Sequence, residues 1–167
     1  MGAMVSRRSL IIGAVSSAAA IATVGVARLD PPAVGRRVLS EEEAAIVAAT
    51  ALTMFPRGVF PVDGVEAGVV ENVDLYLADH MPAVHAAGFR YLLQGLQWGP
   101  LYSHGARFTE LSPAARTEVL QIWGEPSVLA RRVALDALKA VFAAAWIRSP
   151  DVQRTMGWRA SCGGGVA

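Results

Sequence analysis

Cysteine is nearly absent from this 167-residue sequence, which contains Cys162 alone. A single thiol cannot form an internal disulfide, and it cannot supply the several thiolates of a structural zinc or iron–sulfur site. Cys162 lies in a glycine-rich stretch near the C-terminus, where we expect an exposed free thiol rather than a cross-link to a partner. Disulfide-stapled domains and cysteine-rich metal domains are therefore excluded.

Charged residues are also few and balanced, with 15 basic and 14 acidic side chains and a formal net charge of +1. Proteins that bind nucleic acid through its phosphates carry clustered basic side chains. We therefore expect no nucleic-acid partner.

The residue patterns of catalytic and cofactor sites are missing as well. None of His80, His85 and His104 lies three or four residues from a second metal-ligating side chain on one helical face. Ser103 and His104 are adjacent in sequence, which we expect to be poor geometry for a nucleophile and its base. The glycines at 163–165 follow no strand, so they are not a phosphate-binding loop. The sequence thus predicts no catalytic, cofactor or metal site in this chain.

Glu71 and Asp74 lie three residues apart and could form an acid–base pair. An exposed acidic helix face would have the same spacing. We expect the acidic face.

Alternating polar and apolar residues, which indicate β-strands, do not occur, and helical spacing predicts an all-α fold, a bundle of about five helices. Ser40 and Glu43 predict a capping box at the first helix, because each side chain can bond the other residue's backbone N–H. The stretch LYSHGARFTE is expected to be a polar connection. The expected helices cover residues 41–54, 65–79, 83–97, 113–123 and 127–148, with a short turn to about residue 156.

Apolar spacing also predicts which helix faces are buried. The stripe expected in residues 83–97 comprises Val84, Ala87, Tyr91, Leu92 and Leu96. The stripe expected in residues 127–148 comprises Val128, Leu135, Leu138, Phe142 and Ala145, with Arg132, Asp136 and Lys139 on the other side.

The N-terminus resembles an export signal. Arg7 and Arg8 are followed by the apolar residues Leu10 and Ile11, as in the twin-arginine signal that bacteria use to export folded proteins. Residues 9–27 carry no charge, and their number is intermediate between a signal core and a membrane span. An ordinary signal or an uncleaved anchor therefore stays open as an alternative.

These features divide the chain into four expected parts. Residues 1–27 form the signal or anchor segment, and residues 28–38, with two prolines and no periodicity, form a linker. Residues 39–158 form the helical domain, and residues 159–167 form a flexible tail. We expect the protein to be exported across the cytoplasmic membrane and to be periplasmic or membrane-associated.

Large aromatic residues lie near the ends of the expected helices and in the loop after residue 54. Such a ring either seals the end of a core or anchors a partner protein. The candidate partner-interface residues are Phe55, Phe60, Trp98, Trp146 and Trp158.

Several stretches together resemble the small-subunit family called gluconate 2-dehydrogenase subunit 3. They are LSEEEAAIVAATALTMFP, GVVENVD, FTELSPAARTEVL and the long helix that leads into SPDVQRTMGW. The resemblance implies a large partner subunit, an FAD-dependent dehydrogenase of the glucose-methanol-choline type, and commonly a cytochrome c subunit. It implies FAD in the partner and no cofactor in this chain.

Flavoproteins in such complexes often lack an export signal, so the resemblance implies that the twin arginines serve both subunits. We therefore expect a non-catalytic accessory subunit that stabilises the flavoprotein and escorts it through export. Two alternatives stay open: a stand-alone exported or membrane-anchored helical binding module, and an enzyme that uses His80 or His104.

Overall fold

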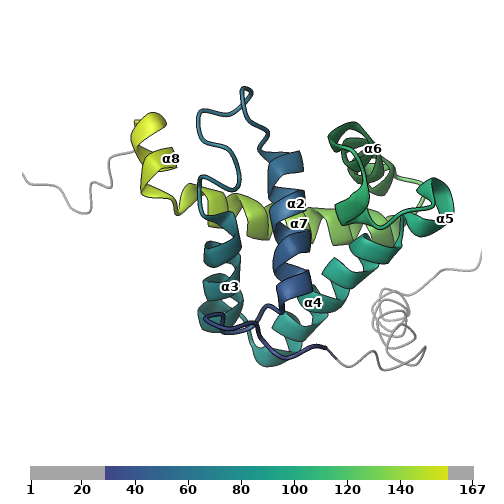
Figure 1. Ribbon diagram of the computed structural model, residues 1–167, viewed down its shortest axis with the longest axis horizontal. Coiled ribbons are helices and arrows are strands. Elements are labelled where there is room, and N and C mark those ends of the chain that lie inside the picture. Colours follow the sequence, from purple (N-terminus) through teal and green to yellow (C-terminus); the bar gives the residue numbers. More distant parts are fainter. Residues whose placement is uncertain (1–28, 158–167) are drawn as a thin grey trace, which may run out of the picture.

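Five helices of at least 12 residues build the computed structural model, which describes residues 29–157 (Figure 1). The all-α prediction is confirmed. The longer helices are α2 (Glu41–Met54), α3 (Val69–His80), α4 (Ala83–Trp98), α6 (Pro113–Gly124) and α7 (Leu129–Ile147). Shorter helical segments are α5 (Leu101–His104), the 3-10 helix η1 (Phe108–Glu110) and α8 (Pro150–Thr155).

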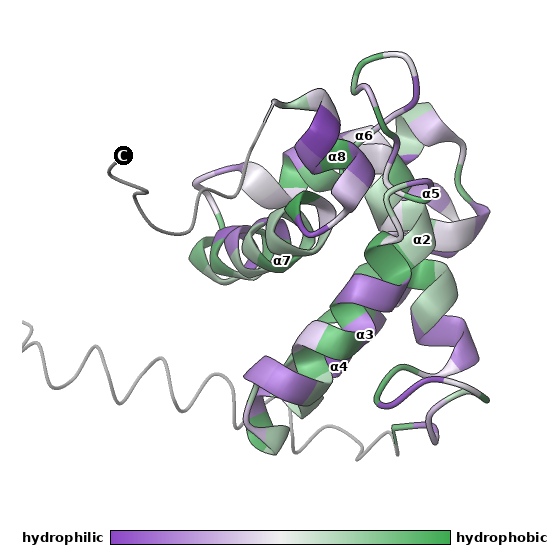
Figure 2. Ribbon diagram, turned by 90° about the vertical axis from the view of Figure 1, so that its left-hand side faces the viewer, coloured by the Kyte–Doolittle hydropathy of each residue, from purple (hydrophilic) through white to green (hydrophobic). Residues whose placement is uncertain are grey.

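Helix α2 is central and packs against α3, α4, α6 and η1, while α7 packs against α3, α6 and α8. The predicted capping box is confirmed, because the Ser40 hydroxyl accepts the N–H of Glu43 and the Glu43 carboxylate accepts the N–H of Ser40. Figure 2 shows hydrophilic residues spaced between hydrophobic ones along α3 and α7, as expected for helices with one buried face.

Several predicted features lie outside the described residues. They are the signal residues Arg7, Arg8, Leu10 and Ile11, the candidate interface residue Trp158, and Cys162. Between residues 29 and 157, no helix combines the length and the apolar composition needed to cross a membrane.

Helix α3 begins at Val69, four residues later than predicted. The Asp63 carboxylate accepts the N–H groups of Val65 and Glu66, which folds these residues into a separate turn. Gly68 then adopts a left-handed conformation with φ of 67°, which other residues rarely adopt. The turn and the glycine together delay the helix.

The stretch from residue 101 to residue 110 is more ordered than the expected polar connection, because it contains α5 and η1. Phe108 is fully buried. Thr109 is fastened to α4 by two hydrogen bonds with the Gln97 amide. Arg116 donates to the carbonyls of Phe108 and Thr109, so side chains from α4 and α6 hold η1 on the core.

The expectation of an exposed acidic face is wrong for Asp74, although Glu71 is exposed. Asp74 is only 3% exposed. Its carboxylate accepts the backbone N–H groups of three successive residues at the end of the linker and the start of the domain, Arg37, Val38 and Leu39, at 2.8, 3.0 and 2.8 Å. The carboxylate therefore fastens the linker to α3, which is a structural role.

The Asp74 carboxyl should make stability pH-dependent. Burial opposes its ionisation, but the three N–H groups and the charge of Arg36 outweigh burial and lower its pKa. A lowered folded-state pKa means that the stabilisation is present above the unfolded value of about 3.9 and is lost as the pH falls through the folded value. We expect Asp74→Asn to lower the free energy of unfolding by about 1–3 kcal/mol at pH 7 and to flatten its decline below about pH 4.

Urea unfolding between pH 2 and pH 7 measures both effects. Glu71→Gln is the matched control, because Glu71 is an exposed acid on the same helix, and an exposed charge contributes little. Equal losses for the two variants would contradict the structural role of Asp74.

Candidate partner interface

Helix α4 is rotated relative to the face predicted from its sequence. Val84 is 73% exposed and Tyr91 is 38% exposed, so the predicted buried stripe is wrong for both residues. Leu96 is buried as predicted, and the rest of the face that contacts the core carries Ala86, Phe89, Arg90, Leu93 and Gln97.

A buried ion pair accounts for this rotation. Arg90 Nε donates to both carboxylate oxygens of Glu43, at 2.9 and 2.8 Å, and the two side chains are 11% and 1% exposed. Arg90 Nη2 donates to the backbone carbonyl of Asp30. A buried charge without its partner costs several kcal/mol, so α4 must turn Arg90 toward α2. Gln97 is also buried on this side of α4, where its amide donates a hydrogen bond to the Thr109 hydroxyl.

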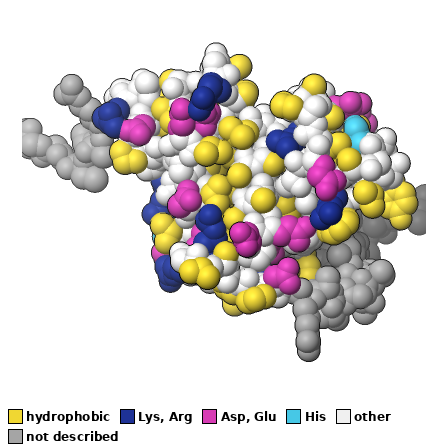
Figure 3. Space-filling model, viewed as in Figure 1, with side chains coloured by type: hydrophobic (Ala, Val, Ile, Leu, Met, Phe, Trp, Pro, Cys, Tyr) yellow, Lys and Arg dark blue, Asp and Glu magenta, His cyan; other side chains and the backbone are white. Residues whose placement is uncertain are grey.

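The rotation leaves an apolar surface exposed on the outer side of α4. We call it the α4 face; it comprises Val84, Gly88, Tyr91, Gly95 and Trp98, with Leu101 and Tyr102 of α5 at its end. None of these residues is acidic or basic. Figure 3 shows apolar side chains at the end of the molecule where α5 lies and also across the middle of the face in view, with acidic and basic side chains between them.

The sequence does contain a signal for the α4 face. Helix α4 has no acidic residue, and Arg90 is its only Lys or Arg. A surface helix normally carries charged residues opposite its apolar stripe. Their absence marks a helix that is apolar on more than one side.

Three of the candidate interface residues pack against each other instead of facing solvent. The rings of Phe55 and Trp146 stack with centroids 4.9 Å apart, and Phe60 meets each of them edge-on at 5.4 Å. Trp146 is 6% exposed, and its indole N–H donates to the Val62 carbonyl at 3.1 Å. These contacts hold the loop after α2 against α7, which is the core-sealing alternative.

Trp98 is the exposed candidate among the described residues. Its side of α4 faces outward, and its exposed fraction is 47%. The guanidinium of Arg107 lies 5.2 Å from the centre of its ring, in a cation–π contact. Trp98 is therefore fixed in place while most of its outer surface stays accessible.

The histidines do not converge on one site. Between residues 29 and 157, no group of three or more His, Cys, Asp or Glu side chains could hold a metal ion. His80 Nε2 lies 3.2 Å from Arg148, and its ring is tilted against Tyr76. His85 is exposed on α4.

Ser103 and His104 are closer than their adjacency in sequence led us to expect. Ser103 Oγ lies 2.8 Å from His104 Nδ1, and His104 Nε2 lies 3.8 Å from the exposed carboxylate of Glu118. The hydroxyl also lies 3.4 Å from the Pro100 carbonyl, within the single turn of α5. His104 therefore connects Ser103 of α5 with Glu118 of α6 at the surface.

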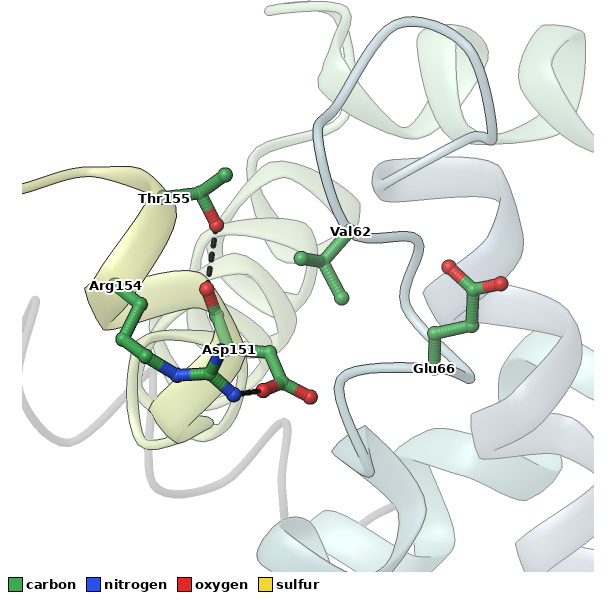
Figure 4. A pocket seen from close by; sticks show the side chains of 5 residues that line it. All are labelled: Val62, Glu66, Asp151, Arg154 and Thr155. Atoms are coloured by element: carbon green, nitrogen blue, oxygen red, sulfur yellow. Dashed lines mark hydrogen bonds and ion pairs between the residues drawn. The ribbon is translucent and has the colours of Figure 1, made fainter.

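A surface hollow lies between α8 and the loop after α2 (Figure 4). Its charged side chains already have partners, because Asp151 pairs with Arg154 and Glu66 pairs with Arg57. The Thr155 hydroxyl donates to the Asp151 carbonyl. The charged side chains that line the hollow are thus already paired, and they do not indicate a binding site for a charged ligand.

The described residues define a small helical domain with an uncharged, apolar helix face on its surface. A family profile described as gluconate 2-dehydrogenase subunit 3 matches residues 41–149, which is more than half of the chain. The chain belongs to this family, as the sequence resemblance indicated. No curated protein and no solved structure matches the chain.

Truncating Trp98 and Trp146 should destabilise the domain to very different extents. Trp146→Ala removes the centre of the aromatic cluster, and we expect it to lower the free energy of unfolding by about 3–5 kcal/mol. Trp98→Ala should lower it by about 1 kcal/mol or less, because the cation–π contact, partial packing and one exposed hydrogen bond to the Gln94 side chain are lost. Denaturant titration of both variants measures the difference, and a larger loss for Trp98→Ala would contradict the assignment of Trp146 to the core.

Proposed function

We propose that this chain is the non-catalytic accessory subunit of an FAD-dependent dehydrogenase of the glucose-methanol-choline type. The observation that carries the proposal is the family match over residues 41–149, whose description names a dehydrogenase subunit. FAD and the reaction belong to the large subunit, and a cytochrome c subunit would accept the electrons.

A subunit of this kind stabilises its partner through the free energy of binding. A protein that binds the folded flavoprotein and not its unfolded form stabilises the folded form by mass action. Exposed apolar residues such as Val84, Trp98 and Tyr102 offer surface for such an interface. The chain needs no chemistry of its own to raise the amount of active partner.

The twin arginines give the accessory subunit a second role. Export of a folded protein suits a partner that must acquire FAD in the cytoplasm, and Arg7 and Arg8 would direct the joint complex to the exporter. The complex would then reside in the periplasm or at the membrane. This role requires the two proteins to stay bound for longer than transport takes.

Co-expression with the proposed flavoprotein partner tests the proposal. We expect at least about a tenfold loss of exported, flavin-loaded dehydrogenase when this chain is omitted, since about 1.4 kcal/mol of lost stabilisation lowers the folded-to-unfolded ratio of the flavoprotein tenfold. Flavin absorbance and activity in the periplasmic and membrane fractions measure the amount. Equal flavin loading and equal export with and without this chain would reject the proposal.

The variant with Arg7→Lys and Arg8→Lys separates stabilisation from escort. It leaves the described domain unchanged, so the flavoprotein should accumulate in the cytoplasm with its flavin bound while its export is lost. Unchanged export of the flavoprotein with this variant would show that it travels by another route.

A further inference from the structure

We propose that a groove between the linker and helix α2 binds a segment of the dehydrogenase subunit in which an aliphatic side chain lies next to an arginine or a lysine. This inference rests on the accessory role proposed above and adds a surface at which the two subunits meet. Three features of the described residues carry it: a linker that is fixed in place, a hollow lined by small apolar side chains, and an excess of acidic groups around that hollow.

Hydrogen bonds fix the linker to the domain at both of its ends. At the first end, the Asp30 carbonyl accepts a hydrogen bond from Arg90. At the second end, the Asp74 carboxylate accepts the N–H groups of residues 37–39. The residues between these two points form a loop at the start of α2 (Figure 1). The linker is thus held without a partner, and the groove that it borders needs no rearrangement before it binds one.

Small apolar side chains make up much of the groove lining. The groove has a volume of about 790 Å³, which lies within the range of pockets that enclose small ligands. Two linker prolines contribute to the lining, together with Ala44, Ala45 and Ala48 of α2 and Val70 of α3. Val34 of the linker also lines the groove, and its side chain is fully exposed. An aliphatic side chain of a partner would remove this apolar surface from water together with its own.

Acidic groups outnumber basic groups around the groove. The acidic residues of the lining are Asp30, Glu41 and Glu42, and the basic residue is Arg36. Arg36 also lies 3.8 Å from Glu71 of α3, so an acid outside the groove already shares its positive charge. The remaining negative charge favours a partner segment that carries a positive group.

Glu41 is the acidic group most available to such a partner. Its side chain is exposed, and within residues 29–157 no other group forms a hydrogen bond or an ion pair with its carboxylate. The dipole of α2 favours an acid here, but Ser40 and Glu43 already cap this end of the helix. An arginine or lysine of the partner would form a charge-assisted hydrogen bond with Glu41. The linker prolines lack N–H groups and therefore cannot take its place as donors.

The affinity of full-length variants for the proposed flavoprotein partner tests the groove. Ala45→Leu fills it from an exposed position of α2, and leucine is a good helix former. Ala137→Leu is the matched control, because it adds the same side chain to an exposed position of α7. Surface plasmon resonance in one detergent buffer measures the dissociation constant. We expect it to rise at least about tenfold for Ala45→Leu and less than about twofold for Ala137→Leu.

Glu41→Gln tests the charge separately from the shape. Glu125→Gln is its control, because Glu125 is an exposed acid that does not line the groove. We expect Glu41→Gln to raise the dissociation constant about threefold at low salt and by less at high salt, because salt screens an exposed ion pair. Glu125→Gln should leave it unchanged. Circular dichroism verifies that every variant is folded.

The outcomes distinguish the groove from the accessory role. Binding of the flavoprotein by the parent chain, with the same affinity in Ala45→Leu and in Glu41→Gln, would overturn the groove and leave the accessory role intact. No binding by the parent chain would contradict both. A doubled mass of the parent chain alone in light scattering, abolished by Ala45→Leu, would overturn the proposal in favour of a second copy as occupant.

Discussion

The ion pair of Glu43 and Arg90 is the interaction on which the arrangement of this domain depends. One carboxylate caps the first turn of α2 through the Ser40 N–H and also accepts the guanidinium of Arg90 from α4. The same guanidinium reaches the carbonyl of Asp30 in the linker. Three segments distant in sequence therefore meet at one buried pair, and removing either charge would leave the other buried without a partner.

Other buried acids hold the loops in a similar way. Asp74 binds three linker N–H groups, and Asp63 binds two N–H groups of its turn together with the guanidinium of Arg57. The backbone N–H of Glu66 makes the largest contribution to the lowered pKa of Asp63, against the opposing effect of burial, and Arg57 lowers it further. Backbone groups in irregular segments lack helix partners, so carboxylates supply acceptors that the loops cannot provide themselves. Buried carboxylates thereby hold the linker and the loop after α2 in place.

Sequence reasoning succeeded where the signals were local. The bounds of α2 agree with the prediction, because Ser40 and Glu43 mark its start and Pro56 prevents its continuation. Sequence reasoning failed where the deciding partner lay far along the chain. The orientation of α4 depends on Glu43, which lies 47 residues before Arg90 in the sequence. Because α4 has apolar residues on several sides, their spacing alone does not show which side is buried. The family could be recognised from its motifs, whereas the burial of Phe108 required the fold.

The rotation of α4 links the buried pair to the composition of the domain surface. Had Val84 and Tyr91 faced the core, the domain would present Arg90 and Gln97 to solvent, and the surface would be an ordinary polar one. Instead these polar side chains point inward, and apolar residues such as Val84 and Trp98 lie on the surface. A buried charge thus determines which side chains the surface presents.

A double-mutant cycle of Glu43→Gln and Arg90→Met, measured by denaturant unfolding, tests this dependence most directly. The account predicts that each single substitution is strongly destabilising and that the double variant is more stable than the sum of the two losses implies, with a coupling free energy of at least about 2 kcal/mol. Losses that add to within about 0.5 kcal/mol would contradict it.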